Sequence, residues 1–461
     1  MDKYQTYTEF KSSGIEWIGP VPDHWGIKPL FGVASTESLK NETGEKTNVL
    51  SLSYGNIIRR DVEKNFGLLP ESFNTYQLVS SGDLILRLTD LQNDKRSLRV
   101  GQAKEEGIIT SAYLKLTAKN IDLDERYFYR LLHSYDTTKV FYGMGGGLRQ
   151  SMKFEEMRRL PMLVPTLDEQ QKIAIFLDHE TAKIDTLIEK QQQLIKLLKE
   201  KRQAVISHAV TKGLNPNAPM RDSGVEWLGQ VPEHWVVSAL KYHVDTVNGF
   251  GFSSTDVCEE GVPFIRAGNI KKKSITETDL YLPQRVVDRY KRVILSEGDI
   301  VISMVGSDPR ILDSAVGQVG VVPKSMAGAV PNQNVVILRE KSDSILKRFL
   351  FYILCSEPYR NHLNVFSHKL ANQSIISSSL IVNAKFMLPS TLEQKRIIDF
   401  LDKRLDNVDD VVLRNYDSLE FLTERRTALI SAAVTGKIDV RNWQAPQPSN
   451  KSNNNYKEVA A

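Results

Sequence analysis

A repeated histidine is the side chain of this sequence best suited to acid–base chemistry. His24 belongs to the block Pro22-Asp23-His24-Trp25, and His234 to the matching block Pro232-Glu233-His234-Trp235. An imidazole can exchange a proton near neutral pH, which would suit a catalytic base. Each histidine also adjoins a tryptophan, a residue type that anchors hydrophobic cores, so we favour a structural role. We expect all the repeated tryptophans to be core anchors: Trp17, Trp25, Trp227 and Trp235.

No other group of residues forms a recognisable catalytic set. Asn215-Pro216-Asn217 does not match the Asn/Asp-Pro-Pro-aromatic segment of amino-methyltransferases, and no GxxxxGK[ST] nucleotide loop occurs. Cys258 and Cys355 are the only cysteines, too few for a disulfide framework or a thiolate zinc site. The sequence therefore favours a non-catalytic chain without a metal site in a reducing compartment, which we expect to be the cytoplasm.

The composition is typical of a globular chain with two or three domains. Hydrophobic residues make up 41% and charged residues 25% of the 461 positions, which are ordinary values. No apolar run approaches the roughly 18 to 20 residues that cross a bilayer, so we expect no membrane association. The formal net charge of +4 permits a nucleic-acid partner without requiring one, because the distribution of charge decides binding.

Two pairs of matching segments indicate a tandem duplication. Ser13-Gly14-Ile15-Glu16-Trp17-Ile18-Gly19 returns 210 residues later as Ser223-Gly224-Val225-Glu226-Trp227-Leu228-Gly229. The segment 165–178 returns 224 residues later as 389–402, and the same offset relates 209–211 to 433–435. The intervening sequences differ, so the order is variable, shared, variable, shared. A repeat of this size corresponds to a domain with a connector.

Each block of the second pair begins a long helix. Thr166 and Ser390 follow a proline and precede Glu169 and Glu393 by three positions. This spacing predicts a capping box, in which the hydroxyl accepts from the third backbone N–H and the carboxylate returns to the N–H of the cap.

The ends of these helices are marked as clearly as their starts. Gly213 and Gly436 lie where each helix would stop, and neither interior contains glycine or proline. About 45 residues would give each helix a length of roughly 65 Å.

Both helices carry an apolar seam with a period of 3.5 residues, which predicts a coiled coil. Equivalent units related by a twofold axis point in opposite directions, so we expect antiparallel pairing, with Leu177 facing Arg426 and Arg202 facing Leu401. The alternative is a pair of shorter amphipathic helices, each lying on its own domain. The seam comprises Leu177, Ile184, Ile188, Gln191, Ile195, Leu198, Leu401, Val408, Val412, Asn415, Leu419 and Leu422.

The two variable segments are predicted to share one mixed α/β fold. Short β-branched runs alternate with polar turns in both. Faint matches persist between Gly82-Asp83-Leu84-Ile85 and Gly298-Asp299-Ile300-Val301, and between Tyr54-Gly55-Asn56-Ile57 and Ala267-Gly268-Asn269-Ile270. The expected class is α+β: two mixed α/β domains separated by two long helices that form an antiparallel coiled coil, with internal pseudo-twofold symmetry. A shared fold with different loops suggests recognition of two different things.

The segment order, the SGxEWxGxxPxHW blocks and the LxEQ…I…FLD and AVTxG helices together resemble the specificity subunit of a Type I restriction-modification system. The resemblance covers nearly the whole chain, up to the end of the second long helix. It implies that each variable segment is a target-recognition domain reading one half of a split double-stranded DNA site, and that the helices space the domains and carry partner subunits. The boundaries are then 1–160 (first recognition domain), 161–213 (first long helix), 214–388 (second recognition domain), 389–442 (second long helix) and 443–461 (disordered tail).

The resemblance also implies partners and the chemistry that they supply. We expect double-stranded DNA, two methyltransferase (modification) subunits and, in the full complex, restriction subunits. No cofactor is expected on this chain, whereas S-adenosylmethionine, with ATP and Mg²⁺ in the restriction complex, is expected on the partner subunits. Two alternatives are a stand-alone DNA modification enzyme and a coiled-coil scaffold that does not bind DNA.

Basic and amide side chains are the candidates for DNA contact. Arginine and lysine can donate to guanine O6 and N7, and asparagine and glutamine can pair with adenine N6 and N7. We expect about a third of the set to touch DNA, mostly at phosphates, and the lysines 271–273 to suit phosphates rather than bases. The glycine-rich segment 143–147 is interpreted as a flexible loop facing DNA. The candidates are Arg59, Arg60, Arg87, Lys95, Arg96, Arg99, Arg149 and Gln150 in the first domain, and Arg266, Asn269, Lys271, Lys272, Lys273, Arg310, Lys369, Asn372 and Gln373 in the second.

Overall fold

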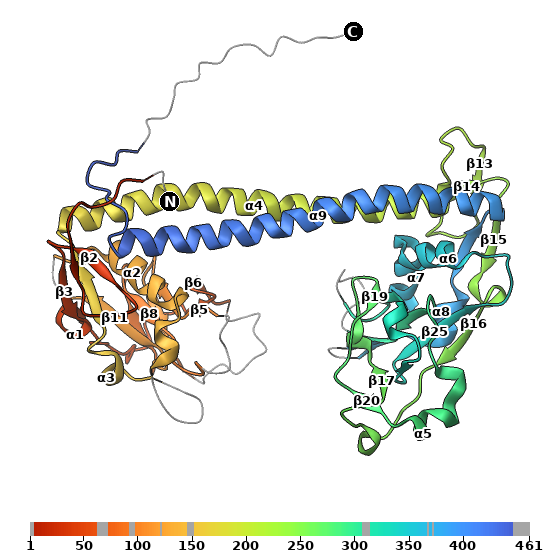
Figure 1. Cartoon of the computed structure of the whole chain (residues 1–461), viewed down its shortest axis with the longest axis horizontal. Coiled ribbons are helices and arrows are strands. Elements are labelled where there is room, and N and C mark those ends of the chain that lie inside the picture. Colours follow the sequence, from red (N-terminus) through yellow and green to blue (C-terminus); the bar gives the residue numbers. More distant parts are fainter. Residues whose placement is uncertain are drawn as a thin grey trace, which may run out of the picture. The chain divides into compact units, whose positions relative to one another are not determined.

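The computed structural model describes residues 4–61, 72–91, 97–119, 122–144, 152–306, 314–366, 368–370 and 373–445. Its contacts divide the chain into two compact units, Met1–Gln191 with Asp417–Ala461, and Gln192–Tyr416. The long helices α4 (Leu167–Lys212) and α9 (Thr391–Val434) each contribute one half to each unit (Figure 1). A unit is therefore one globular domain, the first half of one long helix and the second half of the other.

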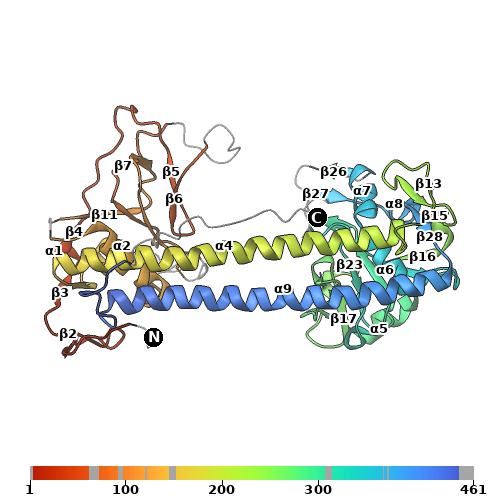
Figure 2. The same cartoon turned by 90° about the horizontal axis from the view of Figure 1, so that it is seen from above.

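Within each unit the two helix halves pack antiparallel, as predicted, and Figures 1 and 2 show α4 and α9 side by side. In the first unit Arg426 Nε donates to Asp185 Oδ1 over 2.7 Å, and in the second Arg202 Nε donates to Asp409 Oδ1 over 2.8 Å. Every residue of the predicted seam is buried or half-buried. The heptad pattern therefore identified the packed faces correctly.

The partners expected across the seam are wrong. Arg426 and Arg202 were expected to face Leu177 and Leu401, but each binds an aspartate about two helical turns further along the partner helix. An apolar seam repeats every seven residues and so permits several registers. The register observed gives each guanidinium a carboxylate instead of burying it against leucine, which would leave the charge uncompensated.

The two domains are built on corresponding antiparallel strands. The first domain has a sheet in the order β4-β11-β8-β9, and the second has one in the order β16-β25-β21-β23-β19-β18, of which the first four strands match. Strands β8 and β21 follow the turns Gly82-Asp83 and Gly298-Asp299. In these turns the aspartate Oδ2 accepts from the backbone N–H of Ser80 over 2.8 Å and of Ser296 over 3.0 Å. The faint sequence match at these turns is thus confirmed as a shared structure.

The elements of the first unit, besides the long helices, are β1 (Phe10–Ser12), β2 (Pro20–Pro22), β3 (Gly26–Pro29), α1 (Leu30–Val33), β4 (Ala34–Ser35), β5 (Leu50–Ser53), β6 (Asn56–Arg59), β7 (Gln77–Val79), β8 (Leu84–Leu86), β9 (Val100–Gln102), β10 (Gly107–Ile109), β11 (Leu114–Ala118), α2 (Glu125–Thr137), η1 (Val140–Gly143), α3 (Phe154–Met157) and β12 (Pro161–Val164).

Those of the second unit are β13 (Met220–Asp222), β14 (Gln230–Pro232), β15 (Val236–Ala239), η2 (Leu240–Tyr242), β16 (Val244–Asn248), η3 (Ser254–Asp256), β17 (Val262–Ile265), η4 (Ala267–Asn269), β18 (Ile270–Lys271), β19 (Ser274–Ile275), β20 (Tyr281–Leu282), α5 (Gln284–Val287), η5 (Asp288–Val293), β21 (Ile300–Ser303), β22 (Val305–Gly306), β23 (Val319–Val321), η6 (Lys324–Met326), β24 (Val330–Pro331), β25 (Val335–Glu340), α6 (Lys347–Cys355), α7 (Glu357–Phe366), β26 (His368–Leu370), β27 (Gln373–Ile375), α8 (Ser378–Asn383) and β28 (Lys385–Leu388).

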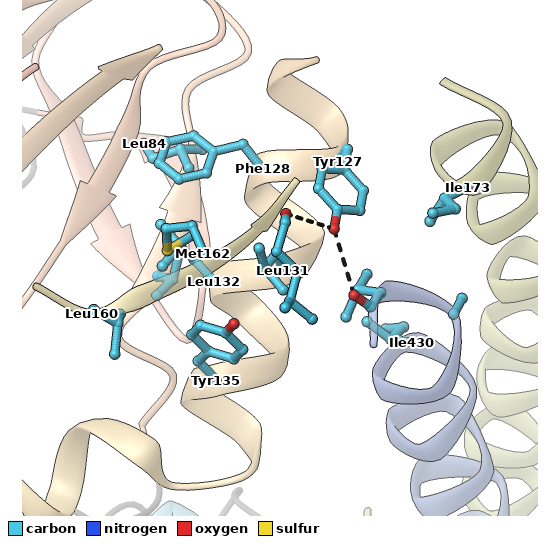
Figure 3. Packing of buried hydrophobic residues seen from close by; sticks show 14 of the residues in the cluster. Leu84, Tyr127, Phe128, Leu131, Leu132, Tyr135, Leu160, Met162, Ile173 and Ile430 are labelled. Atoms are coloured by element: carbon cyan, nitrogen blue, oxygen red, sulfur yellow. Dashed lines mark hydrogen bonds between the residues drawn. The ribbon is translucent and has the colours of Figure 1, made fainter. Parts of the chain in front are cut away.

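The hydrophobic core of the first unit joins its domain to both long helices. Figure 3 shows Tyr127 of α2 facing Ile173 of α4 and Ile430 of α9. The Tyr127 hydroxyl donates to the Leu163 carbonyl over 3.0 Å and lies 3.5 Å from the carbonyl of Val434. One cluster of side chains therefore fixes the domain sheet, α2 and the end of α9 together.

Three sequence expectations about this core need correction. The segment Pro161–Val164, assigned to the first long helix, is strand β12 and pairs with β3. Trp443, assigned to a disordered tail, packs edge-on against Phe176 at 5.2 Å between ring centroids; residues 446–461 lie outside the described residues. Trp17 is 47% exposed and lies edge-on against Tyr135 rather than inside the core.

Both long helices begin at the predicted caps. The backbone N–H groups of Glu169 and Glu393 donate to Thr166 Oγ1 and Ser390 Oγ, each over 3.3 Å. The second half of the predicted capping box is wrong. Each carboxylate instead binds the His-Trp block at the start of its domain, so the third residue of the helix joins elements far apart in the sequence.

In the first unit this contact encloses the carboxylate of Glu169. The Trp25 indole donates to Oε1 over 3.2 Å, the Tyr7 hydroxyl donates to the same oxygen over 2.8 Å, and His24 Nε2 lies 2.8 Å from Oε2. Burial and the bond to Glu169 raise the pKa of Tyr7, which keeps its hydroxyl a donor. The structural role predicted for the repeated histidine is confirmed here.

The second unit repeats the contact in a more open form. The Trp235 indole donates to Glu393 Oε2 over 3.0 Å, and His234 Nε2 lies 3.1 Å from the same oxygen. The side chain of Glu393 is 27% exposed, against 3% for that of Glu169. Water can therefore reach the second carboxylate but not the first.

The C-terminal end of each long helix packs against the tryptophan that binds the start of the other helix. Gly436 follows α9 with a φ of 74°, and a Cβ at this position would collide with Pro22 and lie 3.3 Å from Trp25. Gly213 follows α4 with a φ of 77°, and a Cβ there would lie 3.2 Å from Trp235. Both predicted stops are confirmed, and each needs glycine because of its left-handed backbone and its neighbour.

Two further repeated residues attach each domain to its helix. Asp178 Oδ1 accepts from Arg130 Nη2 of α2 over 2.9 Å, and Asp402 Oδ1 accepts from Arg348 Nε of α6 over 2.9 Å. Just before them along each helix, the amides of Gln170 and Gln394 bond to the loops that precede α2 and α6. The LxEQ…FLD pattern thus consists of attachment points.

Replacing Glu169 by glutamine should destabilise the chain more than the same change at Glu393. The neutral amide loses the charge-assisted hydrogen bonds that Tyr7 and Trp25 make to the carboxylate, and its NH₂ group can replace Oε2 only if His24 presents an unprotonated Nε2. In a site closed to water this costs about 2–3 kcal/mol of unfolding free energy, and about 1 kcal/mol or less where water can compensate. Thermal and urea unfolding of the full-length Glu169→Gln and Glu393→Gln variants measure the difference. Equal losses would contradict the distinction drawn from burial.

Candidate nucleic-acid interface

Among the described arginine candidates of the first domain, the exposed Arg59 is already paired. Arg59, at the end of β6, donates from Nε to both oxygens of Glu105, over 2.9 and 2.8 Å. The ion pair raises the pKa of Arg59 and lowers that of Glu105. A phosphate would have to compete with this carboxylate. Arg60 and Arg87, which directly follow β6 and β8, are half-buried.

The prediction that Arg99 contacts DNA is wrong. Its side chain is fully buried, with Nη1 donating to the Thr89 carbonyl over 3.0 Å and Nη2 to the Asp90 carbonyl over 3.1 Å. Its backbone N–H also donates to Asp136, a carboxyl whose pKa is raised by burial. A guanidinium so enclosed holds the loop after β8 and cannot enter a groove. The sequence gives the charge of an arginine but not its burial.

In the second domain, Arg266 is exposed and Asn269 braces a loop. The backbone N–H of Arg266 donates to Asn269 Oδ1 over 2.9 Å, and Asn269 Nδ2 donates to the Glu277 carbonyl over 3.1 Å. Both ends of this amide are engaged within the loop. It positions Arg266 rather than presenting itself to an adenine.

The lysines of the second domain form the tip of a hairpin. Lys272 and Lys273 connect β18 to β19 with φ values of 48° and 62°. Two successive left-handed residues make a type I′ turn, which normally carries Asn-Gly because other side chains are strained there. Lys271 and Lys272 are exposed, and Lys273 is half-buried. The chain thus keeps cations at a strained tip.

The remaining candidates stay predictions. Lys369 and Gln373 lie on β26 and β27, which pair antiparallel. Most of the glycine-rich segment 143–147 lies outside the described residues. So do the other candidates, which are Lys95, Arg96, Arg149, Gln150, Arg310 and Asn372.

Sequence reasoning overlooked the β5–β6 hairpin and its exposed tip. Its tip residue Tyr54 is 73% exposed and has a φ of 47°. The available signal was a two-residue Tyr-Gly link between the alternating run 50–53 and the short run 56–59 with its two isoleucines, which is typical of a hairpin.

Two other kinds of site were sought in the described part of the chain. No three of its histidine, cysteine, aspartate or glutamate side chains gather as ligands of a metal ion. None of its helices combines the length and apolarity needed to cross a bilayer.

Known proteins with similar sequences are specificity subunits of type I restriction enzymes. The MjaVIII type I restriction enzyme specificity subunit of Methanocaldococcus jannaschii is 28% identical over 343 residues, covering 73% of this chain and 76% of that protein. The EcoBI specificity subunit of Escherichia coli is 22% identical over 352 residues, covering 75% and 72%.

A solved chain supports the same fold. It comes from work on the structural basis of complex assembly and conformational transition of the type I R-M system. The match has a TM-score of 0.63 at 17% identity and covers 91% of this chain and 99% of that one. The Type I restriction modification DNA specificity domain matches residues 100–197 and 232–411, more than half of the sequence. The chain therefore belongs to the Type I restriction-modification DNA specificity family.

Proposed function

We propose that this chain selects the DNA sequence on which a Type I restriction-modification complex acts. Each recognition domain reads one half of a bipartite double-stranded site, and the paired helices set the distance between the halves. The observation that carries the proposal is the repeated attachment of diverged domains to equivalent helix ends, through Trp25 with Glu169 and Trp235 with Glu393. A scaffold without recognition would not need two domains with different loops.

The chemistry is assigned to partner subunits. Two methyltransferase subunits would bind S-adenosylmethionine and modify the target base, which must leave the helical stack to be reached. Restriction subunits would use ATP and Mg²⁺ in the full complex. This chain contributes recognition alone, and the absence of methyltransferase and nucleotide-loop motifs from its sequence supports that division.

One added base pair between the two half-sites should abolish tight binding by the assembled complex. The insertion moves the second half-site by about 3.4 Å and about a tenth of a turn, so its base edges no longer face the second domain. Competition binding against the parent duplex measures the loss, and a base-pair substitution in the spacer, which keeps its length, is the matched control. Unchanged affinity after the insertion would refute a fixed spacing.

The double change Lys272→Asn, Lys273→Gly should weaken DNA binding without weakening the fold. Asn-Gly is the preferred type I′ turn, so the thermal midpoint should stay the same or rise. Loss of up to two phosphate contacts should reduce the slope of log affinity against log salt by about 1 to 2. Titrations of the complex at several salt concentrations measure the slope, with exposed Lys385→Asn as control. An unchanged slope would exclude these lysines as phosphate contacts.

A further inference from the structure

The tip of the β5–β6 hairpin keeps an aromatic residue in a conformation that disfavours it. Tyr54 and Gly55 form the two-residue connection, with φ values of 47° and 80°. The left-handed region is unfavourable for a bulky side chain, and 73% of Tyr54 is exposed, so the ring adds little packing in return. Strain kept at an exposed position points to a role outside folding.

One face of the hairpin is fixed against its own domain. Leu50 is buried and Ile57 half-buried in a small core with Val79 and Ile109, and Leu52 on the same face is buried as well. Contact with strand β9 is close, since a Cβ on its Gly101 would lie 2.6 Å from Leu52 Cδ1. The hairpin is therefore a firmly seated ribbon, and both views show it apart from α4 (Figures 1 and 2).

The opposite face carries side chains suited to base edges. Ser51 pairs with Ile58 and Ser53 with Asn56 across the two strands, so these four residues share the face. Asn56 is exposed, Ile58 is 48% exposed and the serines are half-buried. Hydroxyl and amide groups can donate to and accept from bases, and an alkyl group can contact a thymine methyl. None of these four side chains is a carboxylate that would repel DNA.

The width of the β5–β6 ribbon and the arginines at its base favour binding of this face in the major groove of DNA. The major groove admits a two-stranded β-ribbon, and only its base edges distinguish all four base pairs. Arg59, the last residue of β6, is held by Glu105, and Arg60 follows it at the base of the ribbon, where a groove-bound hairpin would meet the phosphate backbone.

We propose that the β5–β6 hairpin is the base-reading element of the first recognition domain. It enters the major groove of the first half-site with Tyr54 at its leading end, and Asn56 and Ile58 determine base preference. This inference rests on the proposed function and deepens it. It assigns sequence reading to side chains outside the set of basic and amide candidates.

Tyr54→Asn provides the test, because it converts the turn to Asn-Gly and should leave the thermal midpoint unchanged or raised. The assembled complex, with its methyltransferase subunits, is used to select binding duplexes from a library of double-stranded DNA with a randomised segment. We expect Tyr54→Asn to bind the wild-type selected site about tenfold more weakly, comparable to the loss of a base contact. Asn56→Ala and Ile58→Ser should each relax base preference in one half-site and leave the other half unchanged.

Tyr242→Asn in the second domain, where the tyrosine is 67% exposed, is the matched control and should retain both affinity and preference. If the wild-type complex selects a split site but the three hairpin variants select the same site with equal affinity, the hairpin inference is overturned and the proposed function stands. If the wild-type complex selects no common sequence, the proposed function fails and the inference fails with it.

Discussion

At the start of each long helix a glutamate carboxylate accepts a hydrogen bond from a tryptophan indole, and this bond fixes a domain to the helix pair. Glu169 receives hydrogen bonds from Trp25 and Tyr7, while Glu393 receives one from Trp235. Since Gly436 closes on Trp25 and Gly213 on Trp235, each tryptophan joins the start of one helix to the end of the other. A domain is thereby fixed to both helices at once. Leaving such a donor or acceptor unpaired in a closed site would cost a substantial part of a typical domain's stability.

The sequence predicted the elements that depend on local pattern. Helix starts at Thr166 and Ser390, the glycine stops and the buried seam are all encoded within a few turns of chain, and all are confirmed. The predicted pairing register was wrong because an apolar heptad pattern fits several registers equally well. The observed register depends on the ion pairs Arg202–Asp409 and Arg426–Asp185 across the seam. The role of Glu169 was also missed, because a capping box looks the same in sequence whether its carboxylate returns to the cap or binds a residue 144 positions away.

The recognition surface was harder to predict because contact with DNA depends on exposure and backbone geometry. Arg99 and Arg59 carry the same charge, yet one is enclosed by carbonyl groups and the other forms a surface ion pair. Tyr54 was not a candidate because it is neither basic nor an amide; its left-handed backbone and exposure become visible only in three dimensions. The repeated attachment and the strained hairpin tips have a common physical basis. A firmly held domain can tolerate backbone strain at its exposed tips.

If two equivalently attached domains each read one half of a DNA site, the modified sites must show a matching pattern. That pattern can be measured by mapping methylated bases across the genome of cells that express this chain together with the proposed methyltransferase subunits. We expect every methylated site to consist of two short specific sequences separated by one constant number of unspecified base pairs. A single continuous sequence, or two sequences found at varying separations, would show that the domains do not read two half-sites at a fixed spacing.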